Sequence, residues 1–167
     1  MIKKAFILAN QLHEYESVAR RVRSIFFLAT PHRGADLATT LSKLLAVSSG
    51  ARPFVQDLHP KSLATQTIND EFPRYCQQLQ LFSFYETLPM YYGPGRGIIV
   101  EKDLAVLGYA NERNELLNAN HRNVCRYADP TDPNYSIIRN ALASTIANFR
   151  DLDSNPQQFS HDDEHHE

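Results

Sequence analysis

Two acids and a histidine late in the chain have the residue types for acid–base chemistry. Glu101 and Asp103 directly follow the short β-branched run 98–100, and His121 lies in a polar segment further along. A histidine titrates near neutrality, so it can take up and return a proton during a reaction. A carboxylate beside it would orient the ring and stabilise its charged form. An acid followed by a histidine is also the order found in the triads of serine hydrolases built on parallel sheets.

Each of these side chains also has a purely structural interpretation, and spacing alone does not choose between the two. His121 could cap a turn, and Glu101 and Asp103 could be solvated loop acids. The glycine-rich segment 93–97 precedes a strand, whereas phosphate-binding loops open a helix. We therefore interpret this segment as a flexible turn and not as a phosphate site.

The elements that must position these side chains begin with the apolar run 24–28. It stops at Thr-Pro-His-Arg-Gly, residues 30–34, as a buried strand does when it enters a loop. Functional loops follow the carboxyl ends of parallel strands. We therefore expect Thr30, His32 and Gly34 to border the site, and the alternative for His32 is that it pins the loop.

Hydrophobic periodicity predicts the other elements and an α/β fold. In chain order, the pattern predicts a helix over 2–12, a strand over 24–28, a helix from 37 that ends near 48–50, a helix from 62 to about 79, strands over 80–86 and 98–100, and a last helix from 132–133 whose buried face carries Tyr135, Ile138, Leu142, Ile146 and Phe149. We expect one domain over 1–152, with three mostly parallel strands and flanking helices, and a disordered polar tail over 153–167.

Composition excludes several classes of function. The formal net charge of −2 provides no basic field for nucleic acid, and no apolar run approaches the roughly 20 residues of a membrane span. Cys76 and Cys125 are too few for a disulfide framework, so we expect free thiols in an intracellular, cytoplasmic protein. We expect no metal and no cofactor, because triad chemistry needs none.

Several short segments, taken together, are similar to one known family. They are 28–35 (Leu-Ala-Thr-Pro-His-Arg-Gly-Ala), 99–109, Asn111-Glu112, 120–125 (Asn-His-Arg-x-x-Cys), 132–135 and the helical segment 3–9. They resemble segments of the lipase-like α/β hydrolases (the serine-active-site, DUF676-type group). Many of these stand at the N-terminus of fungal NACHT, ankyrin or TPR receptor-like proteins. The resemblance spans about residues 1–150 and implies a partial α/β-hydrolase fold that contains the last three strands of the sheet.

The resemblance also implies roles for individual residues. His121 would be the family's base and Glu101 or Asp103 its acid, with Glu112 a weaker candidate. The family's nucleophile elbow, Gly-x-Ser-x-Gly, occurs nowhere in this sequence. By the resemblance it would lie just before Met1. A base and an acid without a nucleophile do not make a serine hydrolase.

Two functions remain open at this point. The chain is either the C-terminal part of a serine ester or lipid hydrolase domain, inactive alone, or a non-catalytic interaction or signalling module that keeps the hydrolase scaffold. Ala29 and Leu104 replace the family's usual Gly and Ser, and Asn120 replaces an Asp beside the base. The strand over 24–28 would be a bare, apolar sheet edge, which predicts self-association or completion by another chain.

Overall fold

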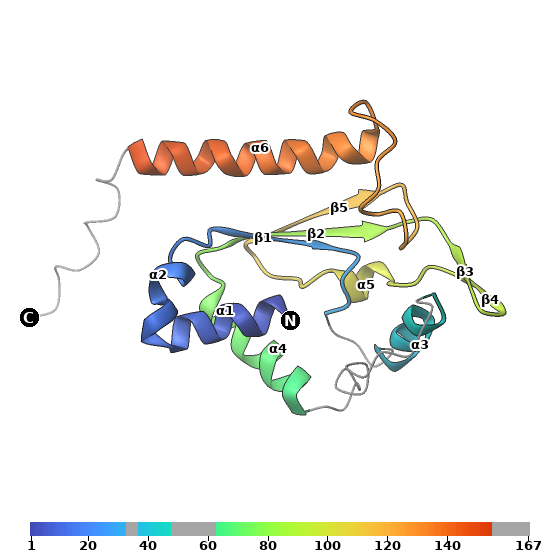
Figure 1. The fold of residues 1–167 in the computed structure, drawn as a ribbon, viewed down its shortest axis with the longest axis horizontal. Coiled ribbons are helices and arrows are strands. Elements are labelled where there is room, and N and C mark those ends of the chain that lie inside the picture. Colours follow the sequence, from blue (N-terminus) through green and yellow to red (C-terminus); the bar gives the residue numbers. More distant parts are fainter. Residues whose placement is uncertain (33–36, 48–62, 155–167) are drawn as a thin grey trace, which may run out of the picture. The chain divides into compact units, whose positions relative to one another are not determined.

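The computed structural model describes residues 1–32, 37–47 and 63–154, and it divides into two compact units (Figure 1). The first unit runs from Met1 to Tyr127 and the second begins at Ala128. The predicted tail over 153–167 lies almost entirely outside the described residues. The two units are described separately below.

The first unit is built on a parallel sheet of three strands. These are β1 (Ser24–Leu28), β2 (Gln80–Glu86) and β5 (Glu112–Leu117), in the order β1-β2-β5. Leu28 pairs with Phe84, and Glu86 pairs with Leu117, so the carboxyl ends of all three strands meet at one edge. This confirms the predicted α/β fold class and places the strands at 24–28 and 80–86 where they were expected.

The third strand is not the predicted one. Residues 98–100 form no strand, and β5 occupies a segment that we expected to be irregular. Ile99 and Val100 are fully buried because they join a small apolar cluster with Leu44 of α3 (Leu37–Val47) and with Ala105. Their β-branched side chains therefore fill a local core, while the more polar β5 forms the outer strand of the sheet.

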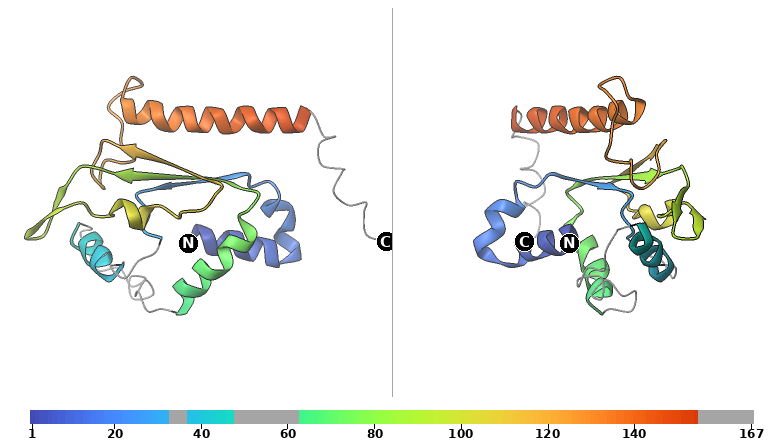
Figure 2. Two further views of the ribbon diagram at one scale, coloured as in Figure 1. Left: turned by 180° about the vertical axis from the view of Figure 1, so that it is seen from behind. Right: turned by 45° about the vertical axis from the view of Figure 1, so that its right-hand side comes forward.

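The glycine-rich segment forms a hairpin and not a simple turn. β3 (Met90–Tyr92) and β4 (Gly95–Gly97) pair antiparallel, with Met90 opposite Gly97. A Cβ atom at Gly95 would lie 2.6 Å from the Tyr92 ring, so this position requires glycine. The hairpin extends beyond the carboxyl end of the sheet (Figure 2).

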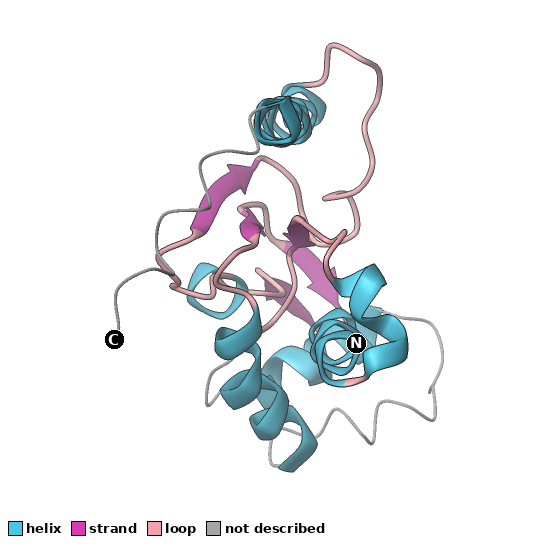
Figure 3. Ribbon diagram, turned by 90° about the vertical axis from the view of Figure 1, so that its left-hand side faces the viewer, coloured by secondary structure: helices cyan, strands magenta, loops and turns pink. Residues whose placement is uncertain are grey.

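Helices α1 (Ile2–Gln11) and α4 (Leu63–Tyr75) cover one face of the sheet (Figure 3). A 3₁₀ turn (His13–Tyr15), α2 (Glu16–Ala19) and α5 (Lys102–Ala105) are the other helices in the described part of this unit. The buried core cluster consists of Phe6, Ile7, Ile25, Phe27, Phe72, Cys76, Leu79, Leu81 and Leu107. The predicted helix over 2–12 is confirmed. The helix predicted from 62 to about 79 ends earlier, at Tyr75, although Phe72, Cys76 and Leu79 are buried together as expected.

The second unit contains α6 (Pro133–Ser154), which begins where Asp132-Pro133 predicted. The Asp132 carboxylate accepts a hydrogen bond from the Asn134 N–H at 2.8 Å, as a capping residue does. The predicted buried face is wrong at Leu142 and Ile146, which are 44% and 51% exposed. The helix carries apolar residues on more than one face, so spacing alone does not identify the covered one.

Ala29 adopts a left-handed backbone conformation, with φ of 43°, directly after β1. A side chain in this region costs roughly 1–2 kcal/mol, which glycine avoids. We expect Ala29→Gly to raise the free energy of unfolding by roughly 0.5–1 kcal/mol, because the relieved strain exceeds the added entropy of the unfolded chain. Urea denaturation measures this change. The matched control is Ala19→Gly, a buried helical position, which should be destabilising; equal effects at both sites would contradict the strain.

Candidate active site

Glu86 is the last residue of β2, and its side chain is fully buried. The two-residue period of the strand places it on the same face as Phe82 and Phe84. Its Oε1 atom accepts a hydrogen bond from the Val100 N–H at 2.6 Å. Its Oε2 atom is buried and has no partner among the described residues. A buried carboxylate is costly unless charges or donors compensate it, and here the Val100 N–H compensates Oε1.

His121 follows β5 and lies against Glu86. Its Nδ1 atom is 3.2 Å from Glu86 Oε1, and its side chain is 23% exposed. The Ala119 carbonyl oxygen accepts hydrogen bonds from Thr87 at 3.2 Å and Leu88 at 3.1 Å. These bonds join the chain after β2 to the chain after β5, so the ends of two neighbouring strands position the acid and the histidine.

The arrangement has the geometry of an acid–base pair. In the tautomer with its proton on Nδ1, His121 donates to the carboxylate, and Nε2 has no partner within the described parts of the chain. An Nε2 atom held in this way can accept a proton from a nucleophile and return it to a leaving group. The pair could therefore serve as the base and the orienting acid of a hydrolytic site.

The two acids predicted from the sequence lie on α5 and not beside His121. Glu101 precedes the helix and Asp103 lies in its first turn, and both are exposed. Within the described residues, neither forms a hydrogen bond or ion pair with His121, whose carboxylate partner is Glu86. The geometry therefore favours Glu86 over both as the acid.

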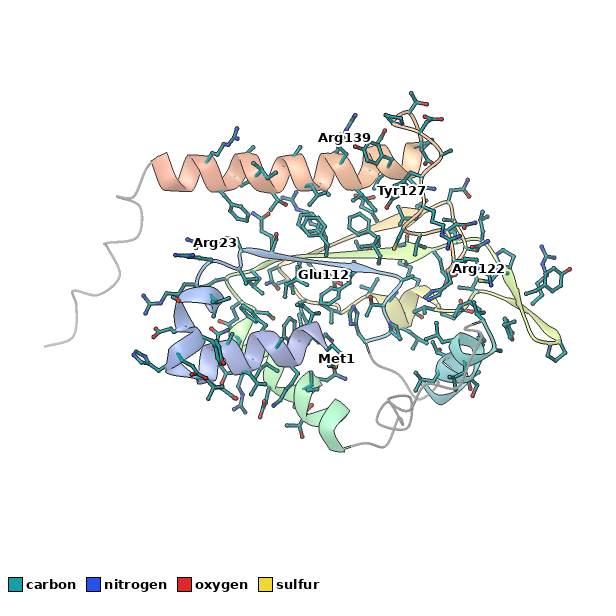
Figure 4. All side chains as sticks on the ribbon, viewed as in Figure 1. Met1, Arg23, Glu112, Arg122, Tyr127 and Arg139 are labelled. Atoms are coloured by element: carbon teal, nitrogen blue, oxygen red, sulfur yellow. The ribbon has the colours of Figure 1, made fainter. Side chains whose placement is uncertain are left out.

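Glu112, the weaker candidate, holds a turn together. Its two carboxylate oxygens accept hydrogen bonds from the N–H groups of Leu107 at 2.8 Å and Gly108 at 2.6 Å. It begins β5, whereas His121 follows the end of that strand. In Figure 4 the label of Glu112 stands apart from that of Arg122, the residue after His121. Asn111 donates to the carbonyl oxygens of Cys76 at 2.7 Å and Leu79 at 2.8 Å. The Asn-Glu pair is thus structural.

The loop after β1 is pinned by His32. Its ring is buried and meets the Phe27 ring edge-on, with centroids 4.5 Å apart. The backbone N–H of His32 donates a hydrogen bond to the Leu104 carbonyl oxygen at 2.8 Å. The backbone carbonyl oxygen of His32 accepts a hydrogen bond from the Asn69 side chain at 2.9 Å. Thr30 donates to the Leu28 carbonyl oxygen at 3.2 Å. Gly34 lies outside the described residues, so only part of the predicted loop can be placed.

The remaining reactive side chains in the described part of the chain add no second centre. Cys76 and Cys125 are free, as predicted, and burial raises the pKa of the Cys76 thiol, which makes it a poor nucleophile. Among the described residues no three His, Cys, Asp or Glu side chains are grouped to hold a metal ion. Within the same residues, no helix combines the length and apolarity that crossing a membrane requires.

Comparison with known proteins finds a curated relative. No protein-family model matches the chain, and no solved structure matches it. The chain is similar to Protein SERAC1 of Bos taurus. The two are 30% identical over 160 residues, which is 89% of this chain but only 23% of that protein. The chain therefore spans about a quarter of the relative's length.

Proposed function

We propose that this chain is part of a serine ester or lipid hydrolase domain and supplies its base and acid. His121 is the base and Glu86 the acid that orients it. The observation that carries this proposal is the 3.2 Å contact between His121 Nδ1 and Glu86 Oε1. The two residues follow neighbouring parallel strands, in the chain order of an α/β-hydrolase acid and histidine.

The resemblance of segments 28–35 and 120–125 to the lipase-like α/β hydrolases supports the same proposal. Similarity to Protein SERAC1 over 89% of the chain is consistent with a lipid-related hydrolase-like domain. β1 is an outer strand of the described sheet, and in this proposal a further strand is added beside it.

The chain alone is inactive in this proposal, because it contains no Gly-x-Ser-x-Gly segment to supply a nucleophile. We expect no turnover of a short-chain aryl ester and no labelling by a fluorophosphonate probe. The control is the His121→Ala variant, which should give the same background. Turnover by the natural chain that disappears in this variant would mean that another residue has replaced the serine.

A second experiment distinguishes a hydrolase part from a non-catalytic module. The coding sequence on either side of this chain is read for an in-frame Gly-x-Ser-x-Gly, and the chain is expressed together with that segment. We expect esterase activity that falls by about 10⁴-fold in Glu86→Gln, as for the loss of a triad carboxylate. An unchanged rate in this variant would remove Glu86 from the mechanism.

The alternative function is a non-catalytic interaction or signalling module that retains the hydrolase scaffold. The absence of the nucleophile motif from this sequence favours it. It predicts that no neighbouring segment restores activity and that the Glu86–His121 pair serves only stability.

A further inference from the structure

The β3–β4 hairpin is attached to the candidate site at both of its ends. The chain leaves the sheet directly after Glu86, forms the hairpin and comes back beside Glu86 at Val100. The Val100 N–H donates a hydrogen bond to the Glu86 carboxylate. Figures 1 and 2 show the hairpin reaching past the carboxyl end of β2. Anything that binds the hairpin is therefore brought close to the candidate site.

The hairpin rests on a preformed base. Tyr92 and Met90 pack against the buried pair Ile99 and Val100. Lys43 of α3 donates to the Ile98 carbonyl oxygen at 2.9 Å, and its Nζ atom lies 5.6 Å from the centre of the Tyr92 ring. These contacts hold the hairpin in place while its outer side chains face the solvent.

The hairpin exposes an aromatic ring and a cation, and an exposed leucine precedes it in the chain. Tyr91 is 74% exposed, and Leu88, two residues before β3, is 41% exposed. The Arg96 guanidinium is exposed and lies 5.7 Å from the centre of the Tyr91 ring. No Asp or Glu occurs from Thr87 to Val100, although the whole chain carries a net charge of −2.

We propose that the hairpin binds a lipid surface that carries anionic headgroups and thereby places the candidate site at that surface. Tyrosine rings reside in the interfacial zone of a bilayer, where one end is apolar and the other wet. Arginine reaches the phosphate layer and pairs with it in a bidentate manner. An exposed tyrosine, leucine and arginine without acids matches this environment. The inference rests on the proposed function for its substrate class, whereas its test measures binding and not turnover.

The test is flotation of the full chain with two kinds of vesicle. One kind contains equal parts of phosphatidylserine and phosphatidylcholine, and the other contains phosphatidylcholine alone. We expect binding to the first kind and much weaker binding to the second. A basic residue at an anionic surface contributes roughly fivefold in affinity, so Arg96→Gln should bind about fivefold more weakly. Tyr91→Ser should also weaken binding, because it removes the interfacial ring.

Two matched controls test whether the effect belongs to the hairpin. Arg139→Gln removes another exposed arginine that lies over a tyrosine ring, 5.9 Å from the centre of Tyr135, and Tyr15→Ser removes another exposed tyrosine. Both should bind like the natural chain. Equal loss in Arg139→Gln, or no vesicle binding at all, overturns the proposal. Size-exclusion chromatography tests the alternative that the hairpin binds a second copy of the chain. A dimer that is lost in Tyr91→Ser, in a chain that does not bind vesicles, would support that alternative.

Discussion

Replacing Glu86 by alanine is expected to lower the free energy of unfolding by roughly 3 kcal/mol. The variant leaves the Val100 N–H without its acceptor, and an unsatisfied buried donor costs about 1–3 kcal/mol. It also leaves a cavity where a fully buried side chain stood. Urea denaturation followed by circular dichroism measures the change as a lower midpoint at an unchanged slope.

Two further variants identify the cause. Glu86→Gln keeps an oxygen that can accept from Val100, so it should lose less than about 1 kcal/mol. Glu101→Ala removes an exposed acid and should change stability by less than about 0.5 kcal/mol. If Glu86→Gln were as destabilising as Glu86→Ala, the stabilisation by Glu86 would come from the charge of its carboxylate and not from its hydrogen bond with Val100. Equal effects at Glu101 and Glu86 would contradict the structural distinction between the two acids.

Replacing Phe72 by alanine should lower the free energy of unfolding by about 3–5 kcal/mol, the largest effect on stability of any change considered. Phe72 is fully buried. Its ring meets Phe6 edge-on at a centroid distance of 6.4 Å and lies 6.5 Å from the Tyr109 ring. It therefore joins α4 to α1 and to the turn that Glu112 holds. Domains are stable by only about 5–15 kcal/mol, so this loss should remove a large part of the stability and lower the urea midpoint strongly.

The measurement is near-ultraviolet circular dichroism together with the urea transition of each protein. Tyr15→Ala, which truncates an aromatic ring that is 47% exposed, is the control and should stay within about 0.5 kcal/mol of the natural chain. A cooperative transition in Phe72→Ala with a loss below about 1 kcal/mol would show that α1 and α4 do not form the core described above.

Strong local patterns explain which parts of the fold could be predicted. The strand at 24–28 is a short apolar run with a clear stop, and α1 has its apolar residues at helical spacing. β5 has neither signal, because Glu112, Arg113 and Glu115 lie on an outer strand that tolerates charge. The β-branched run at 98–100 has the signal of a strand but forms none. Burial in a loop cluster and burial in a strand select the same residue types, so the pattern does not distinguish them.

The candidate site was half predictable. The order of residues and the family resemblance made His121 a candidate, and the structure places it beside an acid, Glu86. Glu86 was missed because it was counted only as the end of a predicted strand. An acid that ends an otherwise apolar strand is a local signal, and it would have been enough to add Glu86 to the candidates. Its contact with His121, however, depends on the pairing of Glu86 with Leu117, which no local pattern contains.

The two outer strands of the sheet differ in a way that limits assembly size. β1 carries no charged residue, and β5 carries Glu112, Arg113 and Glu115. Two chains that joined through their β1 edges would present only charged β5 edges on both sides of the continuous sheet. Charged edges resist the addition of another strand. Such an isologous pair is closed, so growth through β1 ends at two chains and does not continue into a fibre.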